Sequence, residues 1–369
     1  MIPWMTLEAN SLIGIEEEEF NRRLAVVGNN EYLGNTSTFQ LLHVFAFQGA
    51  ALSLLILLDN GVDISSTTEF GVNILHLAAA GGSEEIVQLA LDRGIGIDLK
   101  VAGGKGLTPL LFAARMGHAG IVALLLERSC SVDITDNDRN SALSHAAARG
   151  HERAVLVLLE NGASTAFKDP KGWTALHHAS SNGHSNVVET LIRYGAEVDA
   201  VDSDGLTGLF RAVLSGHAPT ALVLLQHAAN PNLKSRDQGW TPLIAAVWME
   251  HGEVVQALLE YPAGNIDLEV RIETSGKTAL MVAVDKKLAR IVQILISKGA
   301  NVSARDNNGD SPISHARRNN YPSASIREMF DDVLGRRPRA RQHGRAAGIP
   351  DRRQGMLGRI VLNLLGGGA

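Results

Sequence analysis

The 13 histidines of this 369-residue chain are the residues best suited to chemistry, since imidazole serves as a general base and as a metal ligand near neutral pH. Most recur at fixed places, directly after a recurring leucine or directly after a recurring glycine. The first group is His43, His76 and His177, and the second is His118, His151, His184 and His217. A zinc site needs converging ligands, yet the chain has one cysteine and no HExxH segment. Histidines spaced one per repeat therefore predict structural hydrogen bonds rather than a metal site.

Two other segments resemble parts of catalytic motifs. Residues 274–278 read Thr-Ser-Gly-Lys-Thr and contain the GKT that ends a phosphate-binding loop, but Arg271 stands where that loop needs its first glycine. Cys130 lies in a predicted turn without a recognisable nucleophile signature, and the chain has no GxSxG or protein-kinase motif. The sequence therefore predicts no catalytic residue, no cofactor, no metal and no small-molecule substrate.

The element that must position these residues is a repeat of about 33 residues. An aliphatic anchor sets its register, and an alanine follows three residues later in eight of nine windows. The anchors are Leu42, Leu75, Leu110, Leu143, Leu176, Leu209, Leu243, Leu280 and Ile313, and the alanines are Ala78, Ala113, Ala146, Ala179, Ala212, Ala246, Ala283 and Ala316. This period indicates a stacked solenoid, in which each unit packs only on its neighbours. We expect the alanines to lie where the helices of successive units pack side by side.

The clearest unit spans residues 172–199 and reads GWTALHHASSNGHSNVVETLIRYGAEVD. Hydroxyl residues at the place of Thr174 predict helix N-caps, and glycines seven residues after the anchor predict left-handed C-caps. The N-cap candidates are Thr108, Ser141, Thr174, Thr207, Thr241, Thr278 and Ser311, and the C-cap glycines are Gly49, Gly82, Gly117, Gly150, Gly183 and Gly216. This unit closely resembles the ankyrin repeat. The resemblance implies a pair of short helices followed by a hairpin turn that projects sideways.

The predicted fold class is an all-α repeat protein, an ankyrin-repeat solenoid of about nine tandem units with degenerate terminal ones. The expected repeats lie near residues 37–70, 71–105, 106–138, 139–171, 172–204, 205–238, 239–275, 276–308 and 309–334. Residues 1–36 form an N-terminal segment in which 15–27 is a candidate capping helix. Residues 335–369 form an Arg-rich tail that is expected to be disordered. The tail carries a charge of +7 and residues 1–334 carry −12, so a basic tail follows an acidic body.

Composition also indicates the setting of the protein. Because Cys130 is the single cysteine, no intrachain disulfide can form, which is typical of the cytoplasm or nucleus. The Arg-rich tail is compatible with nuclear import, although it contains no lysine. Residues 41–58 are apolar and about long enough to span a bilayer. His43, Gln48 and the repeat register favour a helix pair there instead, so we expect no membrane span, and we expect a monomer.

The resemblance implies that a partner protein would bind to the hairpin tips and the exposed side of the first helices. Aromatic residues, Met and Arg are enriched at interface hot spots. The predicted partner-contacting residues are Arg115, Met116, Arg149, Lys171, Trp173, Leu206, Leu214, Trp240, Trp248 and Met249. Trp240, Trp248 and Met249 fall in one window beside Leu206 and Leu214, which makes this region the preferred patch. For Trp173 and Trp240, packing on an adjacent hairpin is the alternative role.

Three functional interpretations follow from this organisation. The first is a non-catalytic scaffold or adaptor that holds a partner protein of unknown identity. The second is a nuclear transcriptional co-regulator that acts through a DNA-binding partner, since the acidic body argues against direct nucleic-acid binding. The third is a non-catalytic subunit of an enzyme complex. An ankyrin array offers one scaffold to many unrelated targets, so the fold does not select among these functions.

Overall fold

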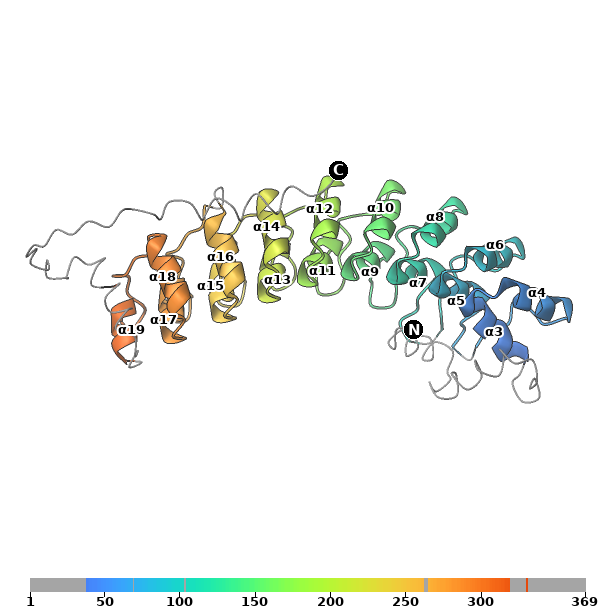
Figure 1. Cartoon of the computed structure of the whole chain (residues 1–369), viewed down its shortest axis with the longest axis horizontal. Helices are drawn as coiled ribbons and strands as arrows, with labels where there is room; N and C mark the ends of the chain where they lie inside the picture. Colours follow the sequence, from blue (N-terminus) through green and yellow to red (C-terminus); the bar gives the residue numbers. More distant parts are fainter. Residues whose placement is uncertain (1–37, 69, 103, 262–264, 319–329, 331–369) are drawn as a thin grey trace, which may run out of the picture.

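The computed structural model describes residues 38–318, apart from 69, 103 and 262–264, together with residue 330. Within these residues, short helices stack in pairs into an elongated, curved array (Figure 1). The first helices of the pairs are α3 (Thr38–Gln48), α5 (Ile74–Gly81), α7 (Pro109–Met116), α9 (Ala142–Ala148), α11 (Ala175–Ser181), α13 (Gly208–Leu214), α15 (Pro242–Trp248), α17 (Ala279–Asp285) and α19 (Pro312–Arg318). The second helices are α4 (Ala51–Asp59), α6 (Glu84–Asp92), α8 (Ala119–Glu127), α10 (Glu152–Glu160), α12 (Ser185–Arg193), α14 (Ala218–Gln226), α16 (Gly252–Glu260) and α18 (Ala289–Ser297). The predicted all-α repeat architecture is confirmed.

Hydroxyl residues begin most of the first helices, as the repeat pattern predicts. The side-chain oxygens of Thr108, Ser141 and Thr207 accept hydrogen bonds from the backbone N–H three residues later, at 3.4, 3.2 and 3.2 Å. The prediction is wrong for Thr278, whose buried hydroxyl has no hydrogen-bond partner. Each formed cap satisfies one of the free backbone donors at a helix start.

Most of the described repeats pass through left-handed backbone at the hairpin tip and at the end of each helix. In the fifth repeat these places are Gly172, Gly183 and Gly195, with φ of 76°, 78° and 86°. Elsewhere non-glycine residues adopt the same conformation, and they are Ser129, Arg139, Ala228, Glu250 and Lys287. Because a β-carbon disfavours positive φ, the packing of the flanking helices must hold these residues in place.

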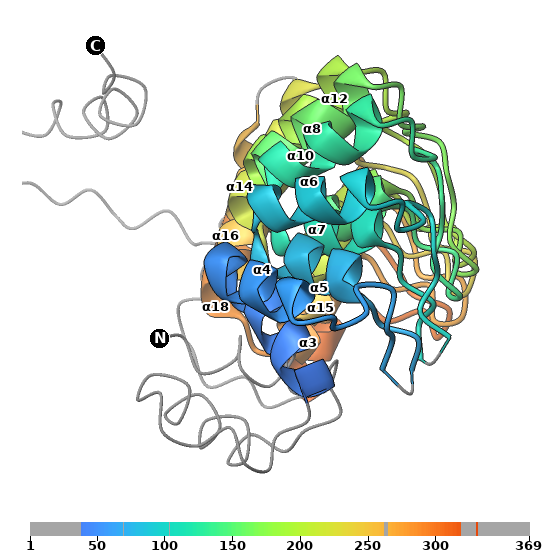
Figure 2. The same cartoon turned by 90° about the vertical axis from the view of Figure 1, so that its right-hand side faces the viewer.

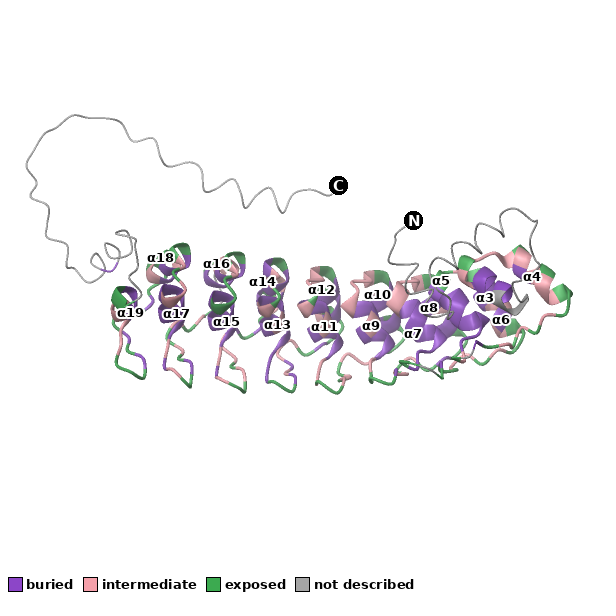
Figure 3. Ribbon diagram, turned by 90° about the horizontal axis from the view of Figure 1, so that it is seen from below, coloured by how far each residue is buried: buried purple, intermediate pink, exposed green. Residues whose placement is uncertain are grey.

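The recurring alanines lie where successive first helices meet. Ala179 and Ala212 have no exposed surface, and the anchors Leu176 and Leu209 beside them are buried. Buried residues run as a continuous band through the stacked helices, whereas the hairpin tips are exposed (Figure 3). The predicted alanine seam is therefore confirmed, and close packing along it leaves little room for larger side chains.

Histidines tie each of the third to sixth repeats to the one before it. The Nε2 atom of each ring donates to a backbone carbonyl 36 to 38 residues earlier in the chain. The pairs are His118 with Ala80 at 3.0 Å, His151 with Arg115 at 3.0 Å, His184 with Ala148 at 3.2 Å and His217 with Ser181 at 3.1 Å. The predicted structural role of these histidines is confirmed.

A second set of histidines, directly after the anchor, reaches forward to the next hairpin. His76 Nε2 lies 2.8 Å from the Leu99 carbonyl oxygen, and His177 Nε2 lies 3.0 Å from that of Leu206. Burial lowers the pKa of His76 to about 4, although the bond to the Leu99 carbonyl opposes this. Burial also lowers the pKa of His177. Both rings are therefore neutral at physiological pH and serve as fixed hydrogen-bonding groups.

The hairpins gather on one side of the stack, as the view along its length shows (Figure 2). The first helices lie on the inner side of the curve (Figure 1). We call the surface formed by the hairpins and the exposed parts of the first helices the concave surface. It brings side chains from several repeats next to one another.

Residues 41–58 fold as parts of α3 and α4, which are separated at Gly49 with φ of 72°. Among the described residues, each helix is too short or too polar to cross a bilayer. The candidate capping helix at 15–27 and the Arg-rich tail at 335–369 lie outside the described residues.

Candidate protein-interaction surface

A cleft of about 530 Å³ opens on the concave surface between the hairpins of the sixth and seventh repeats. Its apolar lining comes from Leu206, Phe210, Leu214 and Trp240, of which Leu206 and Phe210 are buried. Its polar lining includes the exposed residues Asp204, Arg236 and Asp237. The cleft therefore has an apolar floor and a charged rim, an arrangement that suits a bound side chain.

An exposed aromatic surface lies next to this cleft. The rings of Trp240 and Trp248 pack with their centroids 5.3 Å apart at an angle of 50°. Trp248 is 45% exposed and Met249, which directly follows α15, is 46% exposed. Lys286 covers part of the Trp248 ring at 5.1 Å and pairs with the Glu250 carboxylate at 2.9 Å. Trp240 itself is half-buried, and its Nε1 atom is buried without a hydrogen-bond partner.

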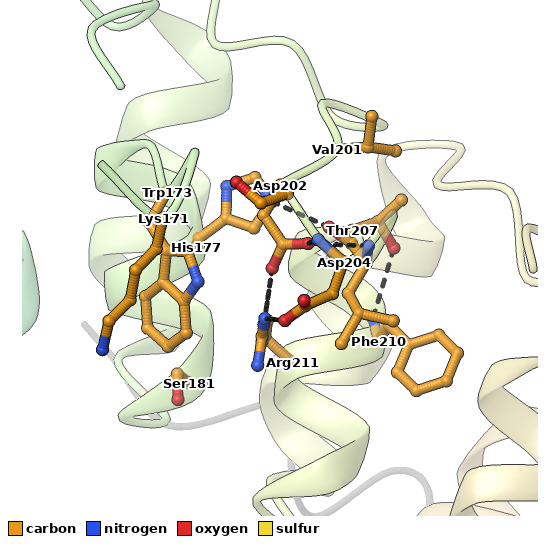
Figure 4. A network of polar contacts seen from close by, with 12 residues as sticks. Lys171, Trp173, His177, Ser181, Val201, Asp202, Asp204, Thr207, Phe210 and Arg211 are labelled. Carbon is orange, nitrogen blue, oxygen red and sulfur yellow. Dashed lines mark hydrogen bonds and ion pairs between the residues drawn. The ribbon is translucent and has the colours of Figure 1, made fainter. Parts of the chain in front are cut away.

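One repeat earlier, the corresponding space is filled by Arg211 of α13 (Figure 4). Its guanidinium carbon lies 4.5 Å from the centroid of the Trp173 ring. Its Nε donates to Asp202 Oδ2 at 2.8 Å, and its Nη2 lies 3.0 Å from Asp204. The Asp202 side chain is fully buried, and its Oδ1 accepts the backbone N–H groups of Asp204 and Leu206 at 2.9 Å each. These contacts fasten the hairpin to the helix.

The same fastening recurs in other repeats with histidine in place of arginine. His145 Nε2 lies 2.9 Å from Asp136, and His315 Nε2 lies 3.1 Å from Asp306. Burial raises the pKa of Asp136, but hydrogen bonds from His145 and Asn140 outweigh it, so the pKa lies below its usual value. In these repeats the residue two positions after the anchor thus fastens the hairpin.

The structure brings together part of the predicted contact set. Leu206, Leu214 and Trp240 line one cleft, and Trp248 packs on Trp240 beside it. Met249 follows Trp248 in the chain and is exposed. Leu206 is only 7% exposed, because its side chain forms part of the floor of the cleft. Its backbone carbonyl accepts the Asp202 N–H and so closes the hairpin.

The other predicted contacts lie elsewhere on the concave surface. Lys171 and Trp173 belong to the hairpin of the fifth repeat, where Lys171 is exposed and Trp173 is half-buried beneath Arg211. Arg115 and Met116 end α7, and Arg149 follows α9, all three half-buried.

Sequence reasoning missed Phe210 and Arg211 as parts of this region. A signal for Arg211 was present at the position two residues after the anchor. That position holds His178, Arg211 and Ala245 in three consecutive repeats, and Arg211 is the one that stacks on the tryptophan of the preceding hairpin.

The two segments that resemble parts of catalytic motifs, the GKT segment and Cys130, have structural places in the fold. Gly276 has φ of 70° at a hairpin turn and Lys277 Nζ pairs with Asp285 at 2.8 Å, so the GKT segment is a hairpin turn, as the register predicts. Cys130 is buried, and burial, assisted by the nearby Asp98, raises the pKa of its thiol to about 12. A neutral, buried thiol is a poor nucleophile.

One cluster in the last described repeat has the composition of a metal site. Ligand atoms of Asp306, Asp310 and His315 lie within 4.8 Å of one another. His315 also contacts Asp285 at 2.8 Å, and Asp310 pairs with Arg318. Because each group is paired within the protein, we interpret the cluster as an ion-pair network that fastens the last hairpin.

The family follows from comparison with known proteins. The pattern for three consecutive ankyrin repeats matches residues 42–138, 128–202 and 194–272, and the single-repeat pattern matches 275–307. The chain belongs to the ankyrin-repeat family. Ankyrin repeats are a protein-interaction fold without catalytic machinery of their own.

Relatives share segments of this ankyrin array. The chain is 32% identical over 102 residues to the ankyrin repeat and KH domain-containing protein mask of Drosophila melanogaster, which covers 28% of this chain and 2% of that protein. It is 38% identical over 80 residues to the probable 26S proteasome regulatory subunit p28 of Saccharomyces cerevisiae, covering 22% of this chain and 34% of p28. It is 44% identical over 68 residues to the human B-cell lymphoma 3 protein, covering 18% of this chain and 15% of that protein. The chain therefore spans only a small part of the relatives that it matches.

Proposed function

We propose that this ankyrin-repeat protein is a non-catalytic scaffold or adaptor that holds another protein on the concave surface of repeats five to seven. The observation that carries the proposal is the exposure of Trp248, which packs on the cleft residue Trp240, and of the next residue in the chain, Met249. Burial of large apolar side chains beneath a partner protein removes them from water, which lowers the free energy of the complex. Tryptophan is also among the residues most enriched at interface hot spots.

The rim of the cleft supports the same proposal. Asp204, Arg236 and Asp237 surround the apolar floor with polar and charged groups. An apolar centre within a polar rim is the usual anatomy of a protein-protein interface. The half-buried aromatic ring of Trp240 joins the floor of the cleft to Trp248, so a partner could contact both.

Affinity capture from a native cell extract tests the proposal. The baits are the intact chain, a Trp248→Ala, Met249→Ala variant, and a control variant with Leu52→Ala and Ile56→Ala. The control pair is 79% and 61% exposed on α4, so it removes apolar surface far from the concave surface. Trp240 is left unchanged because it packs against the core.

We expect a partner that binds the intact chain and the control but binds the Trp248, Met249 variant at least about 30-fold more weakly, as hot-spot residues typically do. All baits must show the same circular dichroism spectrum. A partner that binds both variants and is lost only when residues 335–369 are removed would place the function in the tail, against the proposal.

A second candidate role is a non-catalytic subunit of an enzyme complex. It is favoured by the likeness to p28, which is named as a probable regulatory subunit. The measurement is an enzymatic activity that co-purifies with the chain and stays with the partner when the two are separated. Purified chain that keeps the activity by itself would contradict both roles.

A further inference from the structure

The space occupied by Arg211 between repeats five and six has a counterpart between repeats six and seven, and the contents of the two differ. Arg211 lies two residues after the anchor Leu209, and its guanidinium group stacks on Trp173 and pairs with Asp202. Two residues after the next anchor, Leu243, the chain has the buried Ala245. A methyl group thus replaces a long cationic side chain.

The hairpin partner of the cation is replaced as well. The Asp202 N–H donates to the Leu206 carbonyl at 3.0 Å, and the Ser235 N–H donates to the Trp240 carbonyl at 2.8 Å, so Asp202 and Ser235 hold equivalent places. Both members of the internal ion pair are therefore absent between repeats six and seven. The cleft of about 530 Å³ opens in this region.

The register shows that the two spaces correspond. Residues 33 positions apart in the two repeats line them: Trp173 and Leu206, His177 and Phe210, and Ser181 and Leu214. Figure 4 shows the first member of each pair near the Arg211 side chain. The open cleft is thus the counterpart of a slot that already accommodates a guanidinium group elsewhere in this protein.

The lining of the cleft suits the same group. Phe210 and Trp240 contribute aromatic side chains, and Asp237 contributes an exposed carboxylate, whereas the Asp204 carboxylate already pairs with Arg211. The cation in the lining, Arg236, already donates through Nη1 to the Ser203 carbonyl at 3.0 Å. A guanidinium group stacks on aromatic rings and forms paired hydrogen bonds with carboxylates, and lysine does this less well because it is a point charge.

We infer that the cleft binds an arginine side chain of the partner protein, with Asp237 as its carboxylate contact and with Trp248 and Met249 covering the residues beside it. The inference rests on the proposed function and specifies the partner's chemistry: a segment that presents an arginine next to apolar residues. The segment supplies from outside the cation that Arg211 supplies from within one repeat earlier.

Selection of a random peptide library on the intact chain, followed by titration of the enriched peptides, tests the inference. Each synthetic peptide is compared with a copy in which citrulline, the neutral isostere of arginine, replaces the arginine. The protein variants are Ala245→Arg, which offers the slot an internal cation, and Asp237→Asn, which removes an exposed carboxylate. The Trp248→Ala, Met249→Ala variant reports on the concave surface as a whole.

We expect the enriched peptides to share an arginine and to lose at least tenfold in affinity when it becomes citrulline. Asp237→Asn weakens binding by a similar factor, and Ala245→Arg abolishes it. Because Asp237 is exposed, the Asp237→Asn variant is expected to fold, so it still tests the inference if Ala245→Arg does not fold.

Peptides that require Trp248 and Met249 but contain no arginine and bind Ala245→Arg normally would overturn the inference and leave the proposed function intact. If no selected peptide depends on Trp248 and Met249, the inference and the proposed function are both wrong. If peptides bind only after the eight tail arginines are changed to glutamine, the chain's own tail occupies the cleft and the inference of an external partner is wrong.

Discussion

Glu250 and Lys287 hold the same place in consecutive repeats, and both have left-handed backbone, with φ of 63° and 60°. In the preceding repeat this place belongs to Gly216, with φ of 79°. A side chain in this conformation brings the β-carbon close to the following carbonyl, which costs about 1 kcal/mol. At this place repeats seven and eight therefore carry strain that repeat six, with Gly216, does not.

Lys287→Gly should stabilise the protein by about 0.5 kcal/mol, since relief of strain is partly offset by the greater freedom of glycine in the unfolded chain. The midpoint of urea unfolding measures it. Lys298→Gly is the matched control, because Lys298 ends α18 with an ordinary φ of −87° and should lose stability on the same change. A Lys287→Ala variant as stable as Lys287→Gly would show that strain is not the cause.

Ala179→Leu should destabilise the central repeats by about 1–3 kcal/mol, because Ala179 has no exposed surface and a larger side chain overpacks the seam. Ser181→Leu, two residues later, should change stability by less than about 0.5 kcal/mol, since Ser181 is half-exposed at the end of α11. Thermal unfolding followed by circular dichroism compares the two variants. Equal melting temperatures would contradict the packing of the first helices described above.

Arg211→Met should cost about 3 kcal/mol, because it leaves the fully buried Asp202 carboxylate without its cation. Adding Asp202→Asn to that variant should recover part of the loss, and urea unfolding of the single and double variants measures the coupling. Arg236→Met is the control, because the Arg236 side chain is exposed and it should have little effect. Simple additivity of the Arg211 and Asp202 changes would contradict a buried ion pair.

Stability should fall as the pH is lowered from about 6.5 to about 4. Burial lowers the pKa of His76 from 6.5 to about 4 in the folded protein, so over this range the unfolded chain binds a proton that the folded chain excludes. The loss of stability due to His76 is absent above pH 6.5 and grows to about 3 kcal/mol by pH 4. Urea unfolding at pH 7, 5.5 and 4.5 measures the slope.

His76→Gln should reduce this slope without removing it, because burial also lowers the pKa values of His151 and His177. Unchanged stability between pH 7 and 4.5 in the parent protein would show that these rings can be protonated without opening the fold.

The repeat register could be derived from the sequence because the physical demands of the fold recur every 33 or so residues. Alanine allows close packing between first helices, glycine adopts left-handed backbone at helix ends, and the histidine after that glycine bonds to the preceding repeat. Each requirement recurs at the same place in successive repeats. Ala179, Gly183 and His184 could therefore be assigned their structural roles from one window of sequence. The exposure of Trp248 and Met249 could also be anticipated, since both fall at the outer end of a first helix.

Tertiary structure alone decided what happens between repeats. The cleft forms where Leu206 and Leu214 of one repeat face Trp240 of the next, and the arginine that occupies the preceding slot is replaced by the buried Ala245. No single window contains that relationship, since the volume left by a small side chain depends on neighbours that are about 30 residues away in the chain. Glu250 and Lys287 show the same limit: their side chains disfavour left-handed backbone, and the packing of the adjoining helices imposes it.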